Sequence, residues 1–182
     1  MEIIETGFNG LVVIKPVVYS DRRGYFFESY NQESYRNAGI HFTPVQDNES
    51  KSSKGVIRGL HYQLRPYDQA KLIRVIDGKI FDVALDLRKD SPTFGKWYGI
   101  ELDSGSKTQL FIPKGFAHGF SVLSDEAIIL YKTDNLYNRD SERGIALDDA
   151  DLNIDWHLGD ILPVISEKDT QNPPIKKADN NF

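Results

Sequence analysis

The stretch Lys79-Ile80-Phe81-Asp82-Val83-Ala84-Leu85-Asp86-Leu87-Arg88 alternates between two kinds of side chain. Every second residue from Phe81 to Leu87 is large and apolar, and most of the residues between them are charged. Because successive side chains of a β-strand point to opposite faces, this period of two predicts a strand. Asp82 and Asp86 fall on its non-core face, where we expect them to be solvated or paired.

Short segments of the same kind fill most of the chain, separated by turn signals such as Asp77-Gly78 and Ser104-Gly105. Only the regions around 31–38 and 166–170 read as helical. Many short strands at this spacing are typical of a sandwich or a barrel. The other expected strands are Leu11–Tyr19, Gly24–Tyr30, Thr43–Asp47, Gly55–Gln63, Lys71–Ile76, Trp97–Asp103, Thr108–Ile112, Gly119–Leu123, Ala127–Asp134 and Gly144–Leu147.

The composition is that of a soluble globular protein, with 40% hydrophobic and 27% charged residues. We expect one domain over residues 1–182, with a flexible tail at 173–182, where the sequence is polar and contains proline. The chain has no cysteine, which excludes disulfides, thiolate chemistry and cysteine-based zinc sites. It shows neither a secretory signal nor an apolar run near the roughly 18 residues of a membrane span, so we expect a cytoplasmic protein without membrane contacts.

The net charge of −5, with no long basic run to offset it, argues against nucleic acid as a partner. An anionic ligand would therefore be held by individual arginines and lysines placed inside a cleft.

Two histidines stand on predicted strands beside glycines and a cation. His61 lies in Gly55-Val-Ile-Arg-Gly-Leu-His-Tyr-Gln63, and His118 lies in Ile112-Pro-Lys-Gly-Phe-Ala-His-Gly-Phe120. An imidazole, with an unperturbed pKa of roughly 6.5, exchanges protons near neutrality. The two stretches together indicate a pocket that handles protons on an anionic ligand. His41 and His157 have no such neighbours and are expected to be structural or exposed.

The spacing of these stretches resembles the two motifs of the cupin barrel, which implies an all-β, cupin-like jelly-roll barrel with a few short helices. Metal-binding cupins carry a second histidine where this chain has Gln63 and a glutamate where it has Lys71. An ammonium group repels a divalent cation, and two imidazoles are fewer than the three protein ligands usual at a catalytic zinc. We therefore expect no metal and no other cofactor.

Nearly the whole chain resembles the dTDP-4-dehydrorhamnose 3,5-epimerase family, because a series of individually weak motifs occurs in the family's order. These motifs are Asp21–Tyr30, Val45–Asn48, Arg58–His61, Ala70–Leu72, Asp82–Arg88, Ser91–Gly95, Ile112–Phe120, Leu130–Thr133 and Ser166–Asp169.

The resemblance implies an isomerase that needs no cofactor and inverts C3 and C5 of dTDP-4-keto-6-deoxy-D-glucose, on the route to dTDP-L-rhamnose and surface polysaccharide. The C4 ketone acidifies the hydrogens on C3 and C5. By resemblance, His61 is the base and Tyr131 the acid that returns a proton to the opposite face. Asp169 would fix the tautomer of His61, and Lys71 would stabilise the enolate.

Further residues match family positions that contact the substrate. Arg23 and Arg58 would bind the diphosphate, because guanidinium groups suit phosphate geometry, and His118 would donate a hydrogen bond to the sugar. An aromatic ring from or near Tyr25-Phe26-Phe27 would stack on thymine. The family is homodimeric, with N-terminal strands exchanged between subunits. The other matching positions are Glu28, Gln46, Asn48, Glu142 and Lys168.

One feature of the predicted strand 55–63 conflicts with this set of residues. Strict alternation puts Arg58 and His61 on opposite faces. Either Gly59 carries a bulge that turns both side chains inward, which we favour, or Arg58 serves a site across a subunit boundary.

Three alternatives share most of these residues. The first is a relative that inverts one carbon only, or acts on a differently decorated keto sugar. The second is a metal-dependent cupin dioxygenase or isomerase, which Gln63 and Lys71 disfavour. The third is a cupin that binds the nucleotide sugar without turning it over.

Overall fold

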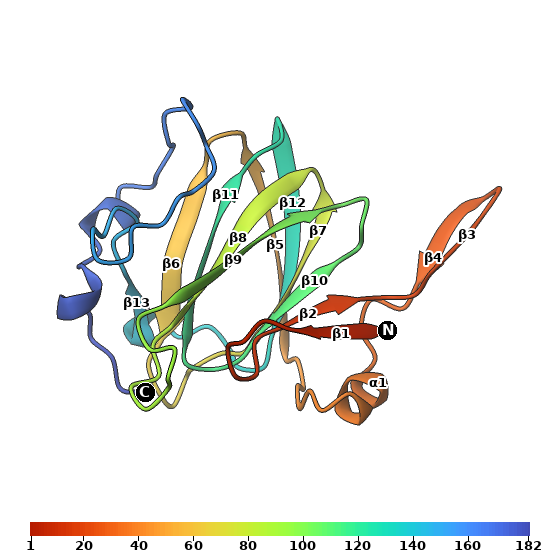
Figure 1. Cartoon of the computed structure of the whole chain (residues 1–182), viewed down its shortest axis with the longest axis horizontal. Helices are drawn as coiled ribbons and strands as arrows, with labels where there is room; N and C mark the ends of the chain where they lie inside the picture. Colours follow the sequence, from red (N-terminus) through yellow and green to blue (C-terminus); the bar gives the residue numbers. More distant parts are fainter.

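Antiparallel pairing joins most of the strands into two sheets that enclose a barrel, and one hairpin stands apart from it (Figure 1). The computed structural model describes all residues from 1 to 182. The strands are β1 (Glu2–Glu5), β2 (Val12–Lys15), β3 (Val18–Asp21), β4 (Gly24–Phe27), β5 (Gln46–Ser53), β6 (Ile57–Gln63), β7 (Lys71–Asp77), β8 (Lys79–Asp86), β9 (Trp97–Asp103), β10 (Gln109–Ile112), β11 (Phe116–Val122), β12 (Glu126–Thr133) and β13 (Glu142–Gly144). The helical elements are α1 (Gln32–Asn37) and three short 3₁₀ turns, η1 (Arg139–Ser141), η2 (Asp169–Gln171) and η3 (Ile175–Lys177).

One sheet has six strands in the order β1-β2-β10-β7-β12-β5, and the other has five in the order β13-β6-β11-β8-β9. Strands that are neighbours in a sheet are often distant in sequence, as in a jelly roll. The expected all-β, cupin-like class is confirmed. No helix in the chain is long and apolar enough to cross a membrane.

Three apolar clusters hold the layers together. The first lies between the two sheets and includes Ile73, Leu110 and Ile129, all fully buried. The second lies on the outer face of the five-stranded sheet, and the third lies where α1 and its flanks cover the outer face of the six-stranded sheet. Both sheets are therefore covered on the outer face as well as on the inner one, and side chains on either face of a strand can be buried.

The alternation in β8 is observed, but the two faces are assigned differently from the prediction. The apolar face with Phe81, Val83 and Leu85 points outward and is covered by the C-terminal segment. Asp82 and Asp86 are completely buried. The expected non-core face was therefore wrong for both aspartates, but each is paired, which was one of the two expected outcomes, because an unpaired buried carboxylate would be costly.

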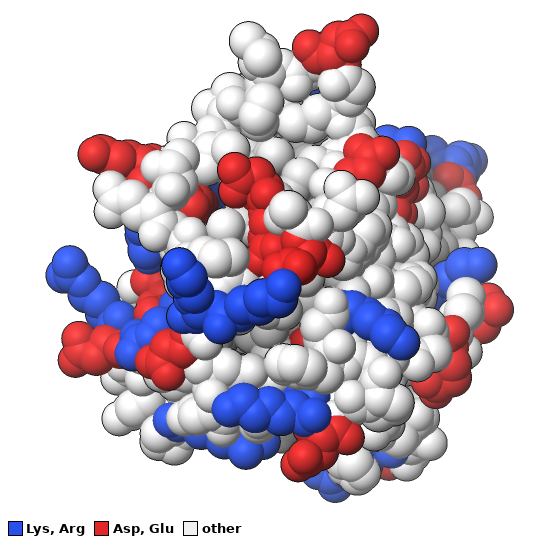
Figure 2. Space-filling view, turned by 60° about the vertical axis from the view of Figure 1, so that its left-hand side comes forward, with Lys and Arg blue, Asp and Glu red and all other residues white.

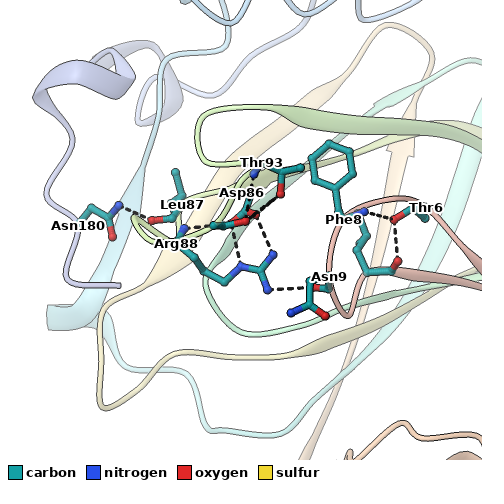
Figure 3. A network of polar contacts seen from close by, with 10 residues as sticks. Thr6, Phe8, Asn9, Asp86, Leu87, Arg88, Thr93 and Asn180 are labelled. Carbon is teal, nitrogen blue, oxygen red and sulfur yellow. Dashed lines mark hydrogen bonds and ion pairs between the residues drawn. The ribbon is translucent and has the colours of Figure 1, made fainter.

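Asp86 is the centre of a polar network that ties the end of β8 to the loop after it (Figure 3). Its carboxylate accepts hydrogen bonds from the Arg88 guanidinium at 2.8–2.9 Å and from the hydroxyls of Ser91 and Thr93 at 2.6–2.7 Å. Arg88 also donates to the Asn9 carbonyl at 2.9 Å, which joins the network to the β1–β2 loop. Burial alone would raise the pKa of Asp86, but these donors bring it down to about 2.

Replacing Asp86 with alanine should lower the free energy of unfolding by about 3 kcal/mol at pH 7, because Arg88 is left without its buried partner. The pKa of about 2 lies below the unfolded value of about 3.9, so the carboxylate stabilises the fold above pH 4 and loses this effect as the pH falls toward 2. Urea unfolding of both proteins should show the difference narrowing by about 2 kcal/mol between pH 5 and pH 2. Asp90→Ala, at an exposed position of the same loop, serves as the control; a constant difference across this range would contradict the prediction.

Strand β5 is longer than the expected strand at Thr43–Asp47. Its inward positions are Gln46, Asn48, Ser50 and Ser52, and none of them is apolar. The sequence here has low strand propensity and no apolar period of two, so it resembles a loop. The strand exists because β12 pairs with it along its whole length.

The C-terminal segment runs along the outside of the five-stranded sheet, next to β6 and β13 (Figure 1). Residues 173–182, where the sequence suggested a flexible tail, lie against the barrel. Phe182 packs against the Tyr62 ring, with the two centroids 6.1 Å apart, and Asn180 donates to the Leu87 carbonyl at 2.7 Å. A polar composition therefore did not prevent docking, because asparagine side chains bond to backbone groups that the barrel leaves open.

Candidate active site

The interior of the barrel opens into two adjoining cavities of about 460 and 300 Å³. His61, Lys71 and Tyr131 line both cavities, so these three residues lie where the cavities meet. His61 comes from β6 of the five-stranded sheet, and Lys71 and Tyr131 come from β7 and β12 of the six-stranded sheet. The cavities are large enough for a ligand bigger than one sugar ring.

His61 is paired with Asp169. The His61 Nε2 lies 2.5 Å from the Asp169 carboxylate, and Asp169 is almost fully buried at the start of η2. Burial raises the pKa of Asp169, but the hydrogen bonds from His61 and Ser166 bring it below its usual value overall. The carboxylate thus keeps the imidazole proton on Nε2 and leaves Nδ1 able to accept another proton.

The β6 backbone bulges between Arg58 and His61. Arg58 pairs with Phe120 and His61 pairs with His118, so three steps along β6 correspond to two steps along β11. The extra residue brings both side chains to the wall of the larger cavity. The bulge at Gly59 is therefore confirmed as the reason why alternation fails in this strand.

Only glycine fits at position 59. Its φ is +135°, and a Cβ atom there would lie 2.5 Å from the Gly119 Cα. We expect Gly59→Ala to lower the free energy of unfolding by about 3 kcal/mol in urea denaturation, since it adds backbone strain and a clash with another strand.

Gly24 provides the matched comparison, because its φ is +126° and nothing lies within 4 Å of a Cβ built there. Gly24→Ala should cost about 1 kcal/mol. Equal losses in the two variants would mean that contact with Gly119 contributes nothing.

Lys71 presents a buried ammonium group to the cavities. The residue is 9% exposed, and no ion pair or side-chain hydrogen bond within the chain engages its Nζ. Burial lowers the pKa of Lys71 to about 8, although the charges of Asp82 and Glu142 oppose this. A buried cation without a close partner is placed to stabilise a negative charge that develops on a ligand.

His118 forms a second histidine–aspartate pair, opposite His61 in the β6–β11 ladder. Its Nε2 lies 2.9–3.0 Å from both Asp82 oxygens, and both residues are buried. Asp82 thus orients the ring so that Nδ1 remains for hydrogen bonding in the cavity that His118 lines. No group of three or more His, Cys, Asp or Glu side chains is arranged to hold a metal ion. Gln63, at the position of a cupin metal ligand, instead bonds to the backbone at Tyr67, Leu136 and Asn138.

Tyr131 stands on β12 beside Asn48 of β5. Burial raises the pKa of its phenol, and the Arg58 charge partly opposes this. The phenol therefore keeps its proton at neutral pH and can donate it.

A chain of hydrogen bonds follows the rim of the smaller cavity. Gln46 donates to Asn48 at 2.8 Å and accepts from the Tyr137 backbone amide at 3.0 Å. The Tyr137 hydroxyl donates to Glu142 at 2.8 Å, and Lys168 pairs with Glu142 at 2.5 Å. Tyr137 was not identified as a site residue from the sequence. The only signal for it is that it is the one aromatic residue in the polar stretch 134–143.

Two predicted substrate-binding residues lie away from these cavities. Arg23 is at the tip of the β3–β4 hairpin, where its only ion pair is with Asp21, and its side chain is 85% exposed. Glu28 follows β4 and accepts hydrogen bonds from Asn31, the N-cap of α1, and from Ser34 within α1. Within one chain, the structure does not bring them to His61, because the hairpin extends away from the barrel (Figure 1).

Lysines and arginines do not merge into one basic surface on the face shown in Figure 2, where acidic side chains lie between them. The positive groups available to an anion in the cavities are instead Arg58, Lys71 and Lys168.

The fold and the site together define a jelly-roll barrel of the cupin type whose pocket holds acid–base groups. A family model described as dTDP-4-dehydrorhamnose 3,5-epimerase matches residues 5–177. The chain is 51% identical over 180 residues to the Shigella flexneri dTDP-4-dehydrorhamnose 3,5-epimerase, covering 98% of both chains. It belongs to the dTDP-4-dehydrorhamnose 3,5-epimerase family.

Solved structures agree with this assignment. A Legionella pneumophila dTDP-6-deoxy-D-glucose-3,5-epimerase in complex with dTDP-4-keto-L-rhamnose matches with a TM-score of 0.93 and 46% identity, over 98% of this chain and 94% of that one. A 3'-monoepimerase from Streptomyces bikiniensis in complex with dTDP-quinovose matches with a TM-score of 0.87 and 34% identity, over 93% and 85% of the two chains. The same barrel therefore occurs in enzymes that invert different numbers of carbons.

Proposed function

We propose that the protein inverts C3 and C5 of dTDP-4-keto-6-deoxy-D-glucose to give dTDP-4-keto-L-rhamnose. The observation that carries this proposal is the meeting of three groups at the junction of the two cavities: His61 with its Asp169 partner, Lys71, and Tyr131. They supply a base, a cation and an acid. The 51% identity to an enzyme of that name supports the choice of substrate.

The reaction begins when Nδ1 of His61 removes the proton from a carbon next to the C4 ketone. The electron pair of the broken C–H bond forms a C=C bond, and the negative charge moves to the C4 oxygen, where the Lys71 ammonium stabilises it. Asp169 stabilises the imidazolium that results. The Tyr131 hydroxyl then donates its proton to the opposite face of the carbon. Before the second inversion, the His61 imidazolium releases its proton to solvent and the Tyr131 phenolate takes one from solvent, which restores the base and the acid. The same sequence at the second carbon then completes the conversion.

The remaining polar residues would hold the nucleotide and the sugar. Arg58 suits the diphosphate, and His118 suits a sugar oxygen because Asp82 fixes its ring. Gln46, Asn48, Glu142 and Lys168 would contact the nucleotide or the sugar along the rim. Arg23 and Glu28 belong to the same proposal only if a second copy of the chain brings them to the pocket.

Incubation with the keto-sugar nucleotide in D₂O tests the function. Deuterium should enter both C3 and C5, and the product should have the L-rhamno configuration. Exchange at one carbon would identify a monoepimerase, and binding without exchange would identify a binding protein. Activity that depends on bound metal and is lost to chelators would identify a metal-dependent cupin.

A homodimer that exchanges N-terminal hairpins, and a cytoplasmic location, are part of this proposal. The hairpin carries Tyr19, Tyr25 and Phe26 with 59–71% of each exposed, an apolar surface that a second copy would cover. Arg23→Ala and His61→Ala variants, each weakly active, should regain activity when unfolded and refolded together, because mixed dimers contain one intact pocket. If mixing restores nothing, Arg23 does not serve the partner's pocket.

A further inference from the structure

The inward face of β5 is polar at every position, which is unusual for a strand of a barrel wall. Gln46 and Asn48 take part in the rim described above, but Ser50 and Ser52 have no role there. Ser50 lines the larger cavity, and its Oγ is buried without a hydrogen-bond partner. Because a buried polar atom without a partner destabilises a fold, such an atom in a cavity wall indicates a group that a ligand satisfies.

Ser52 contacts Arg58 directly. Its Oγ accepts a hydrogen bond from Arg58 Nε at 3.0 Å, and the Lys51 carbonyl lies 3.4 Å from Nη2 of the same guanidinium. Arg58 is otherwise exposed and has no carboxylate partner, so these two contacts from β5 are what orient it. They engage Nε and one N–H of Nη2, and leave the other N–H donors of the guanidinium for the cavity that Arg58 lines.

We propose that β5 builds the anion-binding end of the pocket: Ser52 is a positioning residue that orients Arg58, and the Ser50 hydroxyl donates a hydrogen bond to the same diphosphate. This inference rests on the proposed function for the identity of the anion. Arg58 supplies the charge and forked geometry that a phosphate requires. Ser50 supplies a neutral donor from β5, two residues from Ser52 on the same inward face, and lines the cavity together with Arg58.

The two serines have different expected effects on binding of dTDP, measured by calorimetry. Ser52→Ala should weaken binding about fivefold, the loss expected for one orienting hydrogen bond, and Ser50→Ala about tenfold, since its partner is charged. In an Arg58→Ala background, Ser52→Ala should have no further effect, because it acts only through Arg58, while Ser50→Ala should keep its effect. Ser53→Ala, at an exposed and outward position of the same strand, is the control and should bind as the wild type does.

Kinetics separate positioning from general damage to the fold. With the keto-sugar nucleotide, Ser52→Ala should raise KM about fivefold and leave kcat within twofold, whereas a loosened barrel would lower kcat. Wild-type dTDP affinity in Ser52→Ala, or an equal effect of Ser52→Ala with and without Arg58, would overturn the inference and leave the proposed function intact. If the wild type itself binds no dTDP, the proposed function fails, and the inference fails with it.

Discussion

Replacing His61 with alanine is expected to lower deuterium incorporation at C3 and C5 by about 10²–10⁴-fold, which is the usual contribution of a placed acid–base group. The variant loses the only group in the junction that is oriented by a buried carboxylate and has a free nitrogen to accept a proton. Its dTDP affinity should stay near that of the wild type, because the residues proposed to bind the diphosphate are unchanged. Exchange measured by NMR and binding measured by calorimetry test both statements.

His41→Ala is the matched control for this change, since His41 is exposed and lies outside both cavities. It should exchange protons at the wild-type rate. Persistence of most of the exchange in His61→Ala would show that another group is the base. Simultaneous loss of exchange, dTDP binding and cooperative unfolding would show instead that His61 is needed for the fold.

Replacing Lys71 with methionine is expected to lower kcat by about 10²–10³-fold, the typical loss when one donor to a developing oxyanion is removed. Methionine occupies a similar volume without the charge, so the buried site is filled and the enolate oxygen loses its cation. Because burial lowers the pKa of Lys71 to about 8, kcat/KM of the wild type should also fall above pH 8 as the ammonium loses its proton.

The pH dependence of the residual activity of Lys71→Met tests whether Lys71 causes the decline above pH 8. Its pH profile should lack the decline near pH 8. A decline that remains in the variant would assign it to another group, and a variant with wild-type kcat would remove Lys71 from the chemistry. Lys51→Met, at an exposed position on the outer side of β5, is the control.

The sequence predicted the barrel from its many short strands and turn signals, and His61 stood out because it lies beside glycines and Arg58 on a predicted strand. The roles of Lys71 and Tyr131 came from the resemblance to a family and not from the strand pattern. Asp169 is 108 residues from His61, and only the resemblance to a family linked the two. The short distance between their side chains could be known only from the folded structure.

Other features could not be obtained from periodicity. A period of two in β8 shows which residues share a face of the strand. It does not show which face points into the barrel when both faces are covered, and the prediction therefore put Asp82 and Asp86 on the wrong face. Strand β5 was assigned too short because its inward side chains face a cavity and not an apolar core. Where a strand lines a ligand site, it lacks the alternation of apolar and polar residues by which the other strands are recognised.

The route by which Asp169 reaches His61 has a consequence during protein synthesis. Every strand, through Gly144 of β13, leaves the ribosome before Asp169 does. A nascent chain can therefore form its barrel while the imidazole still lacks its carboxylate. The proposed proton abstraction is then the last ability the molecule acquires, and a nascent chain held with Gly144 outside the ribosome and Asp169 still inside it should be structured but inert.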